Sequence, residues 1–348
     1  MPERKGFPVH ELSWPHILGT LLAGQSLTTS EAEWTMERIM QGEATPAQFG
    51  AFVVALRAKG ETVDEIVGLV STMRRFVVRV EVEGPLVDTC GTGGDRSGSV
   101  NVSTMAAFVA AGAGARVAKH GNRSASSSCG SADVLERLGV RIELTPEAVA
   151  RCIEEAGIGF CFAPAFHPSM RHAAKLRPEL GIPTVFNFLG PLTNPAGALH
   201  QVIGVSNAAM APKMAEVLHR LGSLHALVCH GSDGLDEITT TGPTSVWEVT
   251  PDGVTQWEID PADVGIDRAE PPALRGGDAG RNAVVLEEVL AGKAGPALDI
   301  VLLNAAAAIR AAGLAPDLPS ALALARESVD TGRARAALDA LVDVSNRA

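Results

Sequence analysis

The sequence predicts an α/β fold class: a small N-terminal all-helical domain, then a large α/β domain with a mainly parallel central sheet flanked by helices. Over about the first eighty residues, helix-start signals and apolar residues at helical spacing predict helices only. From about residue 82, short apolar strands alternate with Ala-rich helical segments, which implies a parallel sheet covered by helices. We therefore expect domains at 1–82 and 83–348, with helices from about 168–197 packing back on the first.

The helical domain is predicted from capping boxes, in which a Thr hydroxyl and an acid or amide three residues later satisfy free helix amides reciprocally. The boxes are Thr28 with Glu31, Thr45 with Gln48, and Thr62 with Glu65. Ser13, before Trp14-Pro15, can cap an earlier helix. Short helices need a partner to cover their apolar faces, either the next domain or another copy of the chain, so we expect a homodimer through the N-terminal helices.

The elements of the α/β domain follow in alternation. Strands are predicted at 85–88, 115–119, 159–162, 200–205 and 226–230, a hairpin at 245–249 and 254–259, and helices at 105–112, 131–138, about 168–176, 213–221, 282–291, 297–312 and 318–342. Asn304 is expected to satisfy local backbone groups. Ligands of such sheets sit beyond the carboxyl ends of the strands, and the motifs below lie at such ends.

Composition narrows the class of function. The 348 residues are 46% hydrophobic with a net charge of −11, which disfavours a nucleic-acid partner and favours a small anionic substrate gripped by local groups. Five cysteines form no Cys-x-x-Cys pair, which indicates free thiols in a reducing compartment. No stretch approaches the roughly 18 apolar residues of a membrane span, and no signal peptide is expected. We expect a cytoplasmic protein with no membrane partner.

A glycine-rich loop follows the first predicted strand. Gly91, Gly93 and Gly94 precede Asn101-Val-Ser-Thr, which opens a helical pattern. Glycines allow close backbone approach, and free amides at a helix start favour an anion such as phosphate. The loop is not a dinucleotide fingerprint, because Arg96 stands where the third glycine should be, and no Gly-Lys-Ser/Thr of a Walker A loop follows. Such turns also occur without a ligand, so this loop alone decides nothing.

The segment Lys119-His-Gly-Asn-Arg, with the serines that follow it, is a second candidate. Lys119 and Arg123 are cationic donors, and Ser126, Ser127 and Ser131 offer hydroxyls and amides, so together they can wrap a polyphosphate. The alternatives are a solvated serine-rich loop and a capping network for the following helix.

Two further segments carry charge that suits substrates. In a proline-rich stretch, Arg171, Lys175 and Arg177 could meet a carboxylate, for which arginine is better suited than lysine. After the strand at 226–230, Asp236 and Glu237 are adjacent acids that repel one another unless a cation or donors compensate. With Asp233 they favour a hard divalent cation such as Mg²⁺, the alternative being an ordinary acidic turn.

Five motifs in order, along nearly the whole chain, resemble the anthranilate phosphoribosyltransferases of tryptophan biosynthesis, within the nucleoside phosphorylase/phosphoribosyltransferase fold family. They are Gly91-Thr-Gly-Gly-Asp with Asn101-Val-Ser-Thr, Lys119-His-Gly-Asn-Arg, Gly130-Ser-Ala-Asp-Val-Leu-Glu, Phe186-Asn-Phe-Leu-Gly-Pro-Leu-Thr-Asn-Pro and Asp233-Gly-Leu-Asp-Glu. The resemblance implies a homodimer with Mg²⁺, two ions per active site. It also implies transfer of the 5-phosphoribosyl group from phosphoribosyl pyrophosphate to the amine of anthranilate, the second step of tryptophan synthesis from chorismate.

The resemblance also implies the site residues. By position, phosphoribosyl pyrophosphate binds at Gly91, Gly94, Asp95, Ser99, Asn101, Val102, Ser103, Thr104, Lys119, His120, Gly121, Asn122, Arg123, Ser124, Ala125, Ser126, Ser127 and Ser131. The magnesium ligands are Ser103, Asp236 and Glu237, and anthranilate binds at Gly91, Asn122 and Arg177 with His120 lining the same site. Asp236, Glu237, Asn122, Arg177 and His120 form the catalytic set. The sequence departs from the family's usual residues at Ser124-Ala125, Cys129 and Pro183.

Two rival functions remain open at this point. A pyrimidine nucleoside phosphorylase-like enzyme also cleaves at ribose C1, but it needs a site for free phosphate, and the Asp236-Glu237 pair argues against it. A non-catalytic nucleic-acid-binding paralogue could share the architecture, but the net charge and the intact motifs argue against that. We also expect no strong general base, because an aromatic amine flanked by a carboxylate needs little activation.

Overall fold

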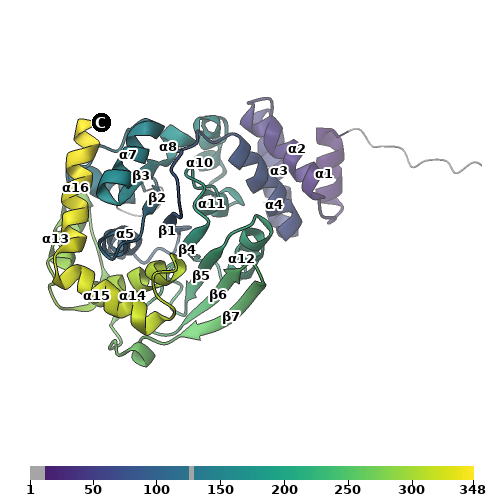
Figure 1. The fold of residues 1–348 in the computed structure, drawn as a ribbon. Helices are drawn as coiled ribbons and strands as arrows, with labels where there is room; N and C mark the ends of the chain where they lie inside the picture. Colours follow the sequence, from purple (N-terminus) through teal and green to yellow (C-terminus); the bar gives the residue numbers. More distant parts are fainter. Residues whose placement is uncertain (1–11, 125–128) are drawn as a thin grey trace, which may run out of the picture. The chain divides into compact units, whose positions relative to one another are not determined.

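The structure is a computed structural model that describes residues 12–124 and 129–348. The chain divides into two units (Figure 1). One comprises the described residues up to Phe76 together with Ser169–Phe186, and the other comprises Val77–Pro168 with Asn187–Ala348. The domain boundaries drawn from the sequence, 1–82 and 83–348, remain predictions beside this division.

The first unit is built from helices, as predicted. They are α1 (Trp14–Leu22), α2 (Thr29–Met40), α3 (Pro46–Lys59), α4 (Val63–Arg75), α9 (Arg171–Ala174) and α10 (Leu176–Leu180). All three capping boxes form at the starts of α2, α3 and α4. Ser13 precedes α1, but its side chain makes no capping hydrogen bond, so that predicted cap is wrong. Helix α9 packs against α2, and α10 packs against α3.

The predicted helix at 168–176 is wrong. A 3₁₀ helix, η1 (Pro168–Met170), is followed by the separate short helices α9 and α10. Pro178 explains the end of α9, because proline lacks the amide that would donate to the carbonyl of Ala174, and its ring crowds that carbonyl. Gly181, at φ 64°, ends α10.

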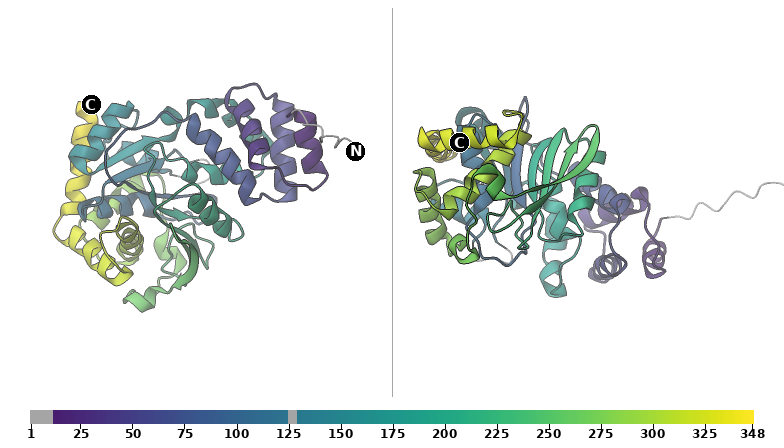
Figure 2. Two further views of the ribbon diagram at one scale, coloured as in Figure 1. Left: turned by 45° about the vertical axis from the view of Figure 1, so that its right-hand side comes forward. Right: turned by 90° about the horizontal axis from the view of Figure 1, so that it is seen from below.

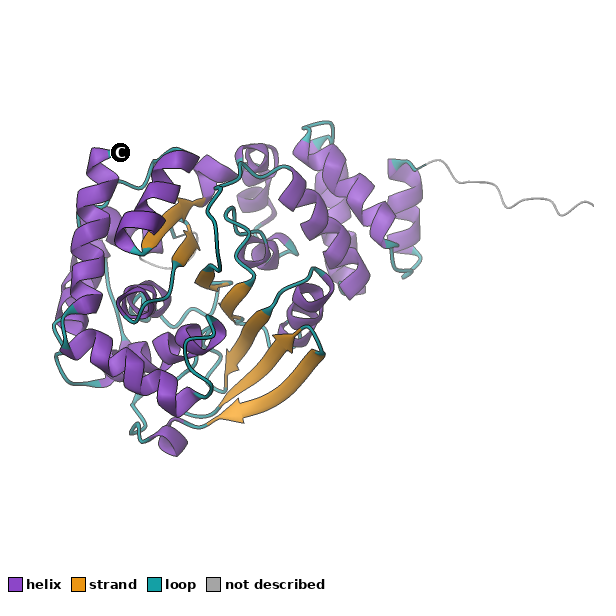
Figure 3. Ribbon diagram, in the orientation of Figure 1, coloured by secondary structure: helices purple, strands orange, loops and turns teal. Residues whose placement is uncertain are grey.

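The second unit carries a seven-stranded sheet in the order β3-β2-β1-β4-β5-β6-β7, drawn in orange in Figure 3. The strands are β1 (Val87–Gly91), β2 (Val117–Gly121), β3 (Ile158–Phe162), β4 (His200–Gly204), β5 (His225–Gly231), β6 (Thr244–Thr250) and β7 (Gly253–Ile259). The first five are parallel, and the predicted hairpin forms the antiparallel edge. The mainly parallel sheet is therefore confirmed.

The second unit also contains helices. They are α5 (Val102–Gly112), α6 (Ser131–Arg137), α7 (Pro146–Ala156), α8 (Ala163–Phe166), α11 (Phe186–Leu189), α12 (Ala211–Arg220), α13 (Ala279–Leu290), α14 (Pro296–Ala311), α15 (Leu318–Asp330) and α16 (Arg333–Arg347), with 3₁₀ turns η2 (Gly190–Leu192), η3 (Pro261–Val264) and η4 (Pro271–Leu274). Helix α5 is buried along most of its length because it packs on β1 and β2 and against the C-terminal helices α14, α15 and α16. The C-terminal helices are drawn in yellow-green to yellow in Figure 2. Helix α12 packs on β5 and β6.

Other helix assignments also differ from the prediction. The single helix at 318–342 is wrong, because Gly332, at φ 76°, separates α15 from α16. Helix α7 was not predicted at all, although Thr145 caps it from the position before Pro146 and Gly157, at φ 74°, ends it. These are ordinary start and stop signals that the sequence does contain.

The strand order places a topological switch point at β1. The chain runs from β1 to β2 and β3 on one side and then returns to place β4 on the other. Gly91 and Gly204 are register partners at the carboxyl ends of β1 and β4. Because ligands of such sheets bind beyond the strands at the switch point, the candidate site is located here.

Candidate active site

The glycine-rich loop between β1 and α5 is shaped by left-handed backbone. Gly93, Gly94 and Gly98 have φ values of 68°, 82° and 63°. The loop is anchored to the end of β4, because Thr92 N–H donates to Gly204 O (2.9 Å) and Ser206 Oγ donates to Gly93 O (2.8 Å). Ser206 has no motif around it, and sequence reasoning missed it.

The loop and the start of α5 hold two carboxylates of the chain itself. Gly93 N–H donates to Asp236 Oδ2 (2.7 Å), and Ser103 N–H donates to Glu237 Oε1 (3.1 Å). Free amides near a helix start stabilise negative charge. The structure therefore brings the predicted metal ligands Ser103, Asp236 and Glu237 together from α5 and the segment after β5.

Two glycines make room for Asp236. A Cβ on Gly204 would lie 1.6 Å from Asp236 O, and a Cβ on Gly91 would lie 2.2 Å from Asp236 Oδ2. No side chain fits at either position without moving the acidic segment. Gly91, predicted as a substrate contact, thus also determines where Asp236 lies.

Burial and mutual repulsion disfavour the charged forms of Asp236 and Glu237. Burial raises the pKa of Asp236, and the charge of Asp95 adds to that effect. Burial and the charge of Asp236 raise the pKa of Glu237. Asp95 Oδ2 is itself buried without a hydrogen-bond partner among the described residues. A bound cation would stabilise all three charges.

The donor set fits Mg²⁺ completed by substrate. Within 12–124 and 129–348 no group of three or more His, Cys, Asp or Glu side chains could hold a metal ion by itself. Mg²⁺ is usually bound by one or two carboxylates plus substrate phosphates and water, so Asp236 and Glu237 suffice.

Asn304, from α14, positions the acidic segment. Its Oδ1 accepts from Ile238 N–H (2.9 Å), and its Nδ2 donates to Ile238 O (2.8 Å) and to Ile300 O (2.8 Å). The bond to Ile300 O confirms the predicted contact with a local backbone group, and the two bonds to Ile238 add long-range contacts that were not predicted. Asp233 is also structural, because its carboxylate accepts from the hydroxyls of Thr239 and Thr241.

Lys119 lies beneath the site instead of projecting from it. It is 2% exposed, and its Nζ donates to Thr89 O (2.6 Å) and Ser103 Oγ (3.4 Å). The buried carboxylate of Asp88 accepts from His120 N–H (3.0 Å) and from Asn194 Nδ2 (2.8 Å). This network ties β1 to β2 and to the segment that carries Asn194. Asp88 and Asn194 were not identified as functional from the sequence.

The rest of the segment that begins at Lys119-His-Gly-Asn-Arg lies between β2 and α6. Asn122 is exposed, its Oδ1 accepts from Arg123 N–H (2.7 Å), and its carbonyl accepts from Ser131 Oγ (3.3 Å). Arg123 pairs with Asp133 (3.0 Å) and Glu136 (2.5 Å) of α6. A Cβ on Gly121 would lie 2.2 Å from Ser131 Oγ. Ala125, Ser126 and Ser127 lie outside the described residues.

The remaining residues predicted to contact phosphoribosyl pyrophosphate differ in exposure. Val102 and Thr104 are 1% exposed, so their side chains face the core. Asn101 is engaged on both side-chain atoms, by Cys129 O (3.2 Å) and Asn282 Nδ2 (2.8 Å). Gly94, Asp95, Ser99 and Ser124 lie in the loops at the carboxyl ends of β1 and β2. Cys129 and Pro183, the departures, are buried and exposed respectively.

His120 packs against a second histidine that sequence reasoning missed. Its Nε2 lies 3.2 Å from Nε2 of His167, and both rings are nearly buried. Burial, with the neighbouring His167 and Lys119 charges, lowers the pKa of His120 to about 3, and burial lowers the pKa of His167 to about 4. Both imidazoles are therefore neutral near pH 7.

Arg177 belongs to the first unit, on α10. Its guanidinium lies 6.0 Å from the ring centroid of Phe186, and burial lowers its pKa. It makes no ion pair with any residue that the structure describes, which leaves its planar fork available to a carboxylate.

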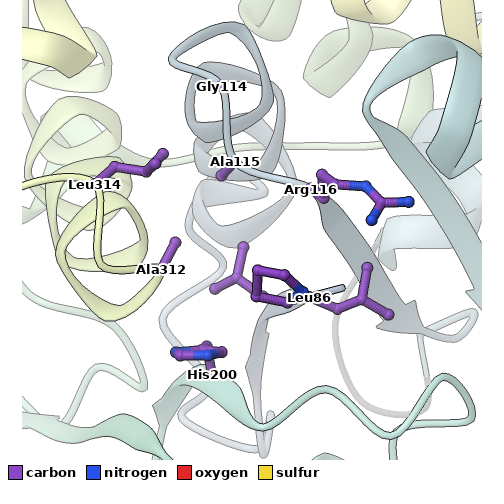
Figure 4. Close-up of a pocket in the computed structure, with 9 residues that line it drawn as sticks. Leu86, Gly114, Ala115, Arg116, His200, Ala312 and Leu314 are labelled. Atoms are coloured by element: carbon purple, nitrogen blue, oxygen red, sulfur yellow. The ribbon is translucent and has the colours of Figure 1, made fainter. Parts of the chain in front are cut away.

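A separate cavity lies at the opposite ends of the central strands (Figure 4). It is about 100 Å³ and is lined by Leu86, Arg116, His200, Leu314 and their neighbours, at the amino ends of β1, β2 and β4. His200 Nδ1 lies 2.7 Å from Ala311 O, and Arg116 Nη1 donates to Glu83 O. It is too small for a phosphoribosyl donor and lies away from the switch point, so it is not the candidate site.

Comparison with known proteins identifies the family. Residues 15–77 match the model described as "Glycosyl transferase family, helical bundle domain", and residues 83–335 match "Glycosyl transferase family, a/b domain". The anthranilate phosphoribosyltransferase of Chloroflexus aurantiacus is 54% identical over 94% of this chain and 97% of its own length, and that of Arthrobacter sp. (strain FB24) is 56% identical over 94% of each.

Solved structures agree with this. The crystal structure of anthranilate phosphoribosyltransferase (TrpD) from Thermus thermophilus has a TM-score of 0.90 at 45% identity and covers 95% of this chain and 99% of that one. The enzyme from Saccharomyces cerevisiae, in complex with PRPP and Mg, has a TM-score of 0.88 at 28% identity, covering 97% and 100%. The chain therefore belongs to the anthranilate phosphoribosyltransferases of this glycosyl transferase family.

Proposed function

We propose that the protein transfers the 5-phosphoribosyl group from phosphoribosyl pyrophosphate to the amine of anthranilate, releasing pyrophosphate, in tryptophan biosynthesis. The observation that carries the proposal is the pair Asp236 and Glu237, half-buried at the switch point and held there by amides of the glycine-rich loop and of α5. Family membership supports the same reaction.

Asp236, Glu237 and Ser103 are proposed to hold Mg²⁺, with two ions per active site. When bound, Mg²⁺ supplies positive charge that offsets the charge of the departing pyrophosphate. Asp95, whose Oδ2 has no hydrogen-bond partner in the described chain, adds negative charge beside these ligands. The relative from Saccharomyces cerevisiae, whose complex contains PRPP and Mg, supports this proposal.

Groups of the protein itself are proposed to position the two substrates. The exposed loop from Gly93 to Ser99 is proposed to bind the phosphates, as its amides and hydroxyls allow. Asn122 and Arg177 are proposed to bind anthranilate, since the guanidinium of Arg177 suits a carboxylate. Catalysis is then largely a matter of orientation and charge stabilisation.

No strong general base is proposed. The attacking group is an aromatic amine, and His120, which lines the acceptor site in the prediction, is a weak base because burial lowers its pKa to about 3. A nucleoside phosphorylase-like reaction is less well supported, because free phosphate would have to bind beside the carboxylates of Asp236 and Glu237, which repel it.

A homodimer through the helical unit is part of the proposal. Leu22, at the end of α1, is 79% exposed, and Val54, on α3, is 42% exposed. A second copy of the chain would cover these apolar side chains. We also propose a cytoplasmic location, which the five buried free cysteines support. None of the helices in the described chain combines the length and apolar character required to cross a bilayer.

The test of the reaction is anthranilate fluorescence in the presence of phosphoribosyl pyrophosphate, with and without Mg²⁺. We expect the fluorescence to fall only when Mg²⁺ is present, with one pyrophosphate released per anthranilate consumed. A folded protein that leaves the fluorescence unchanged would refute the acceptor assignment, and pyrophosphate release without loss of anthranilate would indicate another acceptor.

A further inference from the structure

Arg96 stands in an unfavourable backbone conformation. Its φ is 60°, and it is the one non-glycine residue with positive φ in the part of the chain that the structure describes. A left-handed conformation at a residue with a Cβ is strained and persists where the surroundings or a function require it. The neighbouring left-handed positions of this loop, Gly94 and Gly98, are glycines.

Nothing within the described protein explains the side chain at this position. Arg96 is exposed and makes no hydrogen bond or ion pair with any described residue. It directly follows Asp95, and Asp236 and Glu237 lie at the same site, yet it pairs with none of the three carboxylates. Its guanidinium is therefore available to a ligand of the loop.

The two cations predicted from the sequence to bind phosphoribosyl pyrophosphate, Lys119 and Arg123, already contact groups of the protein. Lys119 is buried and donates to Thr89 O and Ser103 Oγ. Arg123 pairs with two acids of α6. Arg275, whose backbone bridges to Ser99, is exposed but has an ordinary φ of −67°. Among these four cations, Arg96 alone combines an available guanidinium with a backbone conformation that calls for an explanation.

We propose that Arg96 binds the pyrophosphate of phosphoribosyl pyrophosphate and positions the donor in the glycine-rich loop. This inference rests on the proposed function, because it names a residue for the same donor site. A planar guanidinium donates two parallel hydrogen bonds to a phosphate, which lysine cannot reproduce. The pyrophosphate carries most of the donor's charge, and a net charge of −11 makes a local cation in the donor loop useful.

The experiment compares three variants by steady-state kinetics and by calorimetric binding of phosphoribosyl pyrophosphate with Mg²⁺ and without anthranilate. Arg96→Gly removes the side chain and suits the left-handed backbone, so its melting temperature should stay within about 2 °C of that of the unsubstituted chain. Arg96→Lys keeps the charge. Arg151→Ala, an exposed arginine on α7, removes the same charge elsewhere.

We expect Arg96→Gly to weaken donor binding and raise its KM roughly tenfold, the size of one charge-assisted contact, while the KM for anthranilate changes little. Arg96→Lys should recover part of the loss, and Arg151→Ala should have no effect. An unchanged donor affinity in Arg96→Gly would overturn the inference, as would an equal loss in Arg151→Ala. An inactive unsubstituted protein would instead refute the proposed function, so the two failures are distinguishable.

Discussion

At the scale of single residues, the site depends on where two carboxylates are placed. Backbone amides of Gly93 and Ser103 orient Asp236 and Glu237, and Asn304 holds the residue that follows them. Asp236 and Glu237, as proposed ligands of a cation, act through their charge and position. Residues such as His120, which is neutral and buried, contribute shape.

This difference predicts unequal effects of two alanine substitutions. Asp236→Ala removes a proposed metal ligand and should lower kcat by about 100-fold or more, the cost of losing a group that stabilises transition-state charge. His120→Ala should lower kcat by less than about tenfold, because no strong base is needed. Steady-state kinetics at saturating Mg²⁺ measures both, and the reverse order would show that His120 transfers a proton.

Arg177 is predicted to act on one substrate only. Arg177→Ala should raise the KM for anthranilate roughly tenfold and leave that for phosphoribosyl pyrophosphate nearly unchanged, because the guanidinium is proposed to pair with the acceptor's carboxylate. Arg171→Ala, in the same segment, serves as the control and should behave as the unsubstituted chain does. Equal losses for both substrates in Arg177→Ala would indicate a structural role.

At the scale of elements, the ends of β1 and β4 meet the acidic segment at glycines. Gly204→Ala would place a Cβ 1.6 Å from Asp236 O, so the segment must move. We expect a loss of about 1–3 kcal/mol in the free energy of unfolding, the usual cost of overpacking. We also expect a higher Mg²⁺ concentration to be needed for half-maximal activity, because the segment that carries Asp236 has moved. Gly19→Ala, where no atom lies within 4 Å of the added Cβ, is the matched control. If Gly204→Ala retains full stability and activity, this packing argument fails.

The antiparallel edge is tied to the parallel sheet and to α14 by one acid. Glu248 of β6 accepts from His225 of β5 (2.8 Å) and Arg310 of α14 (2.7 Å), and these bonds lower the pKa of Glu248 to about 2. A lowered pKa means that this stabilisation is present above the ordinary pKa near 4.5 and is lost as pH falls from there toward 2.

Glu248→Gln should therefore cost about 1–3 kcal/mol of unfolding free energy at pH 7. The difference from the unsubstituted chain should shrink as pH falls below about 4.5, as denaturant unfolding across pH would show. Glu216→Gln, which breaks an exposed pair with Arg220, should change stability by less than about 1 kcal/mol at any pH. A difference for Glu248→Gln that does not depend on pH would contradict the assignment.

At the scale of the whole molecule, the helical unit carries the most exposed large hydrophobic side chain described, Leu22. The proposed dimer predicts a mass of twice 36.1 kDa by light scattering. Leu22→Glu should shift the protein toward single chains, because a carboxylate would be buried without a partner in the interface. Leu224→Glu, 47% exposed on the other unit, should leave the mass unchanged. A single-chain mass for the unsubstituted protein would refute the dimer.

Local sequence signals account for the fold class and most of the element types. Thr-x-x-Glu and Thr-x-x-Gln boxes and the alternation of apolar runs predict α2, α3, α4 and the parallel strands, all of which form. The acidic pair was also identified from sequence, because adjacent acids at a strand end are unfavourable without a counter-charge. Local signals failed where one residue ended a helix, as at Pro178 and Gly332.

Long-range contacts, by contrast, determine which side chains the site can use. The bond from Lys119 to Thr89, the contact of His120 with His167, and the bonds from Asn304 to Ile238 join residues distant in the chain. Such contacts depend on strand order and on helix packing across the sheet, which hydrophobic periodicity does not specify. The residue types thus indicate the chemistry of the site, whereas the fold determines which charges are paired inside the protein and which face a ligand.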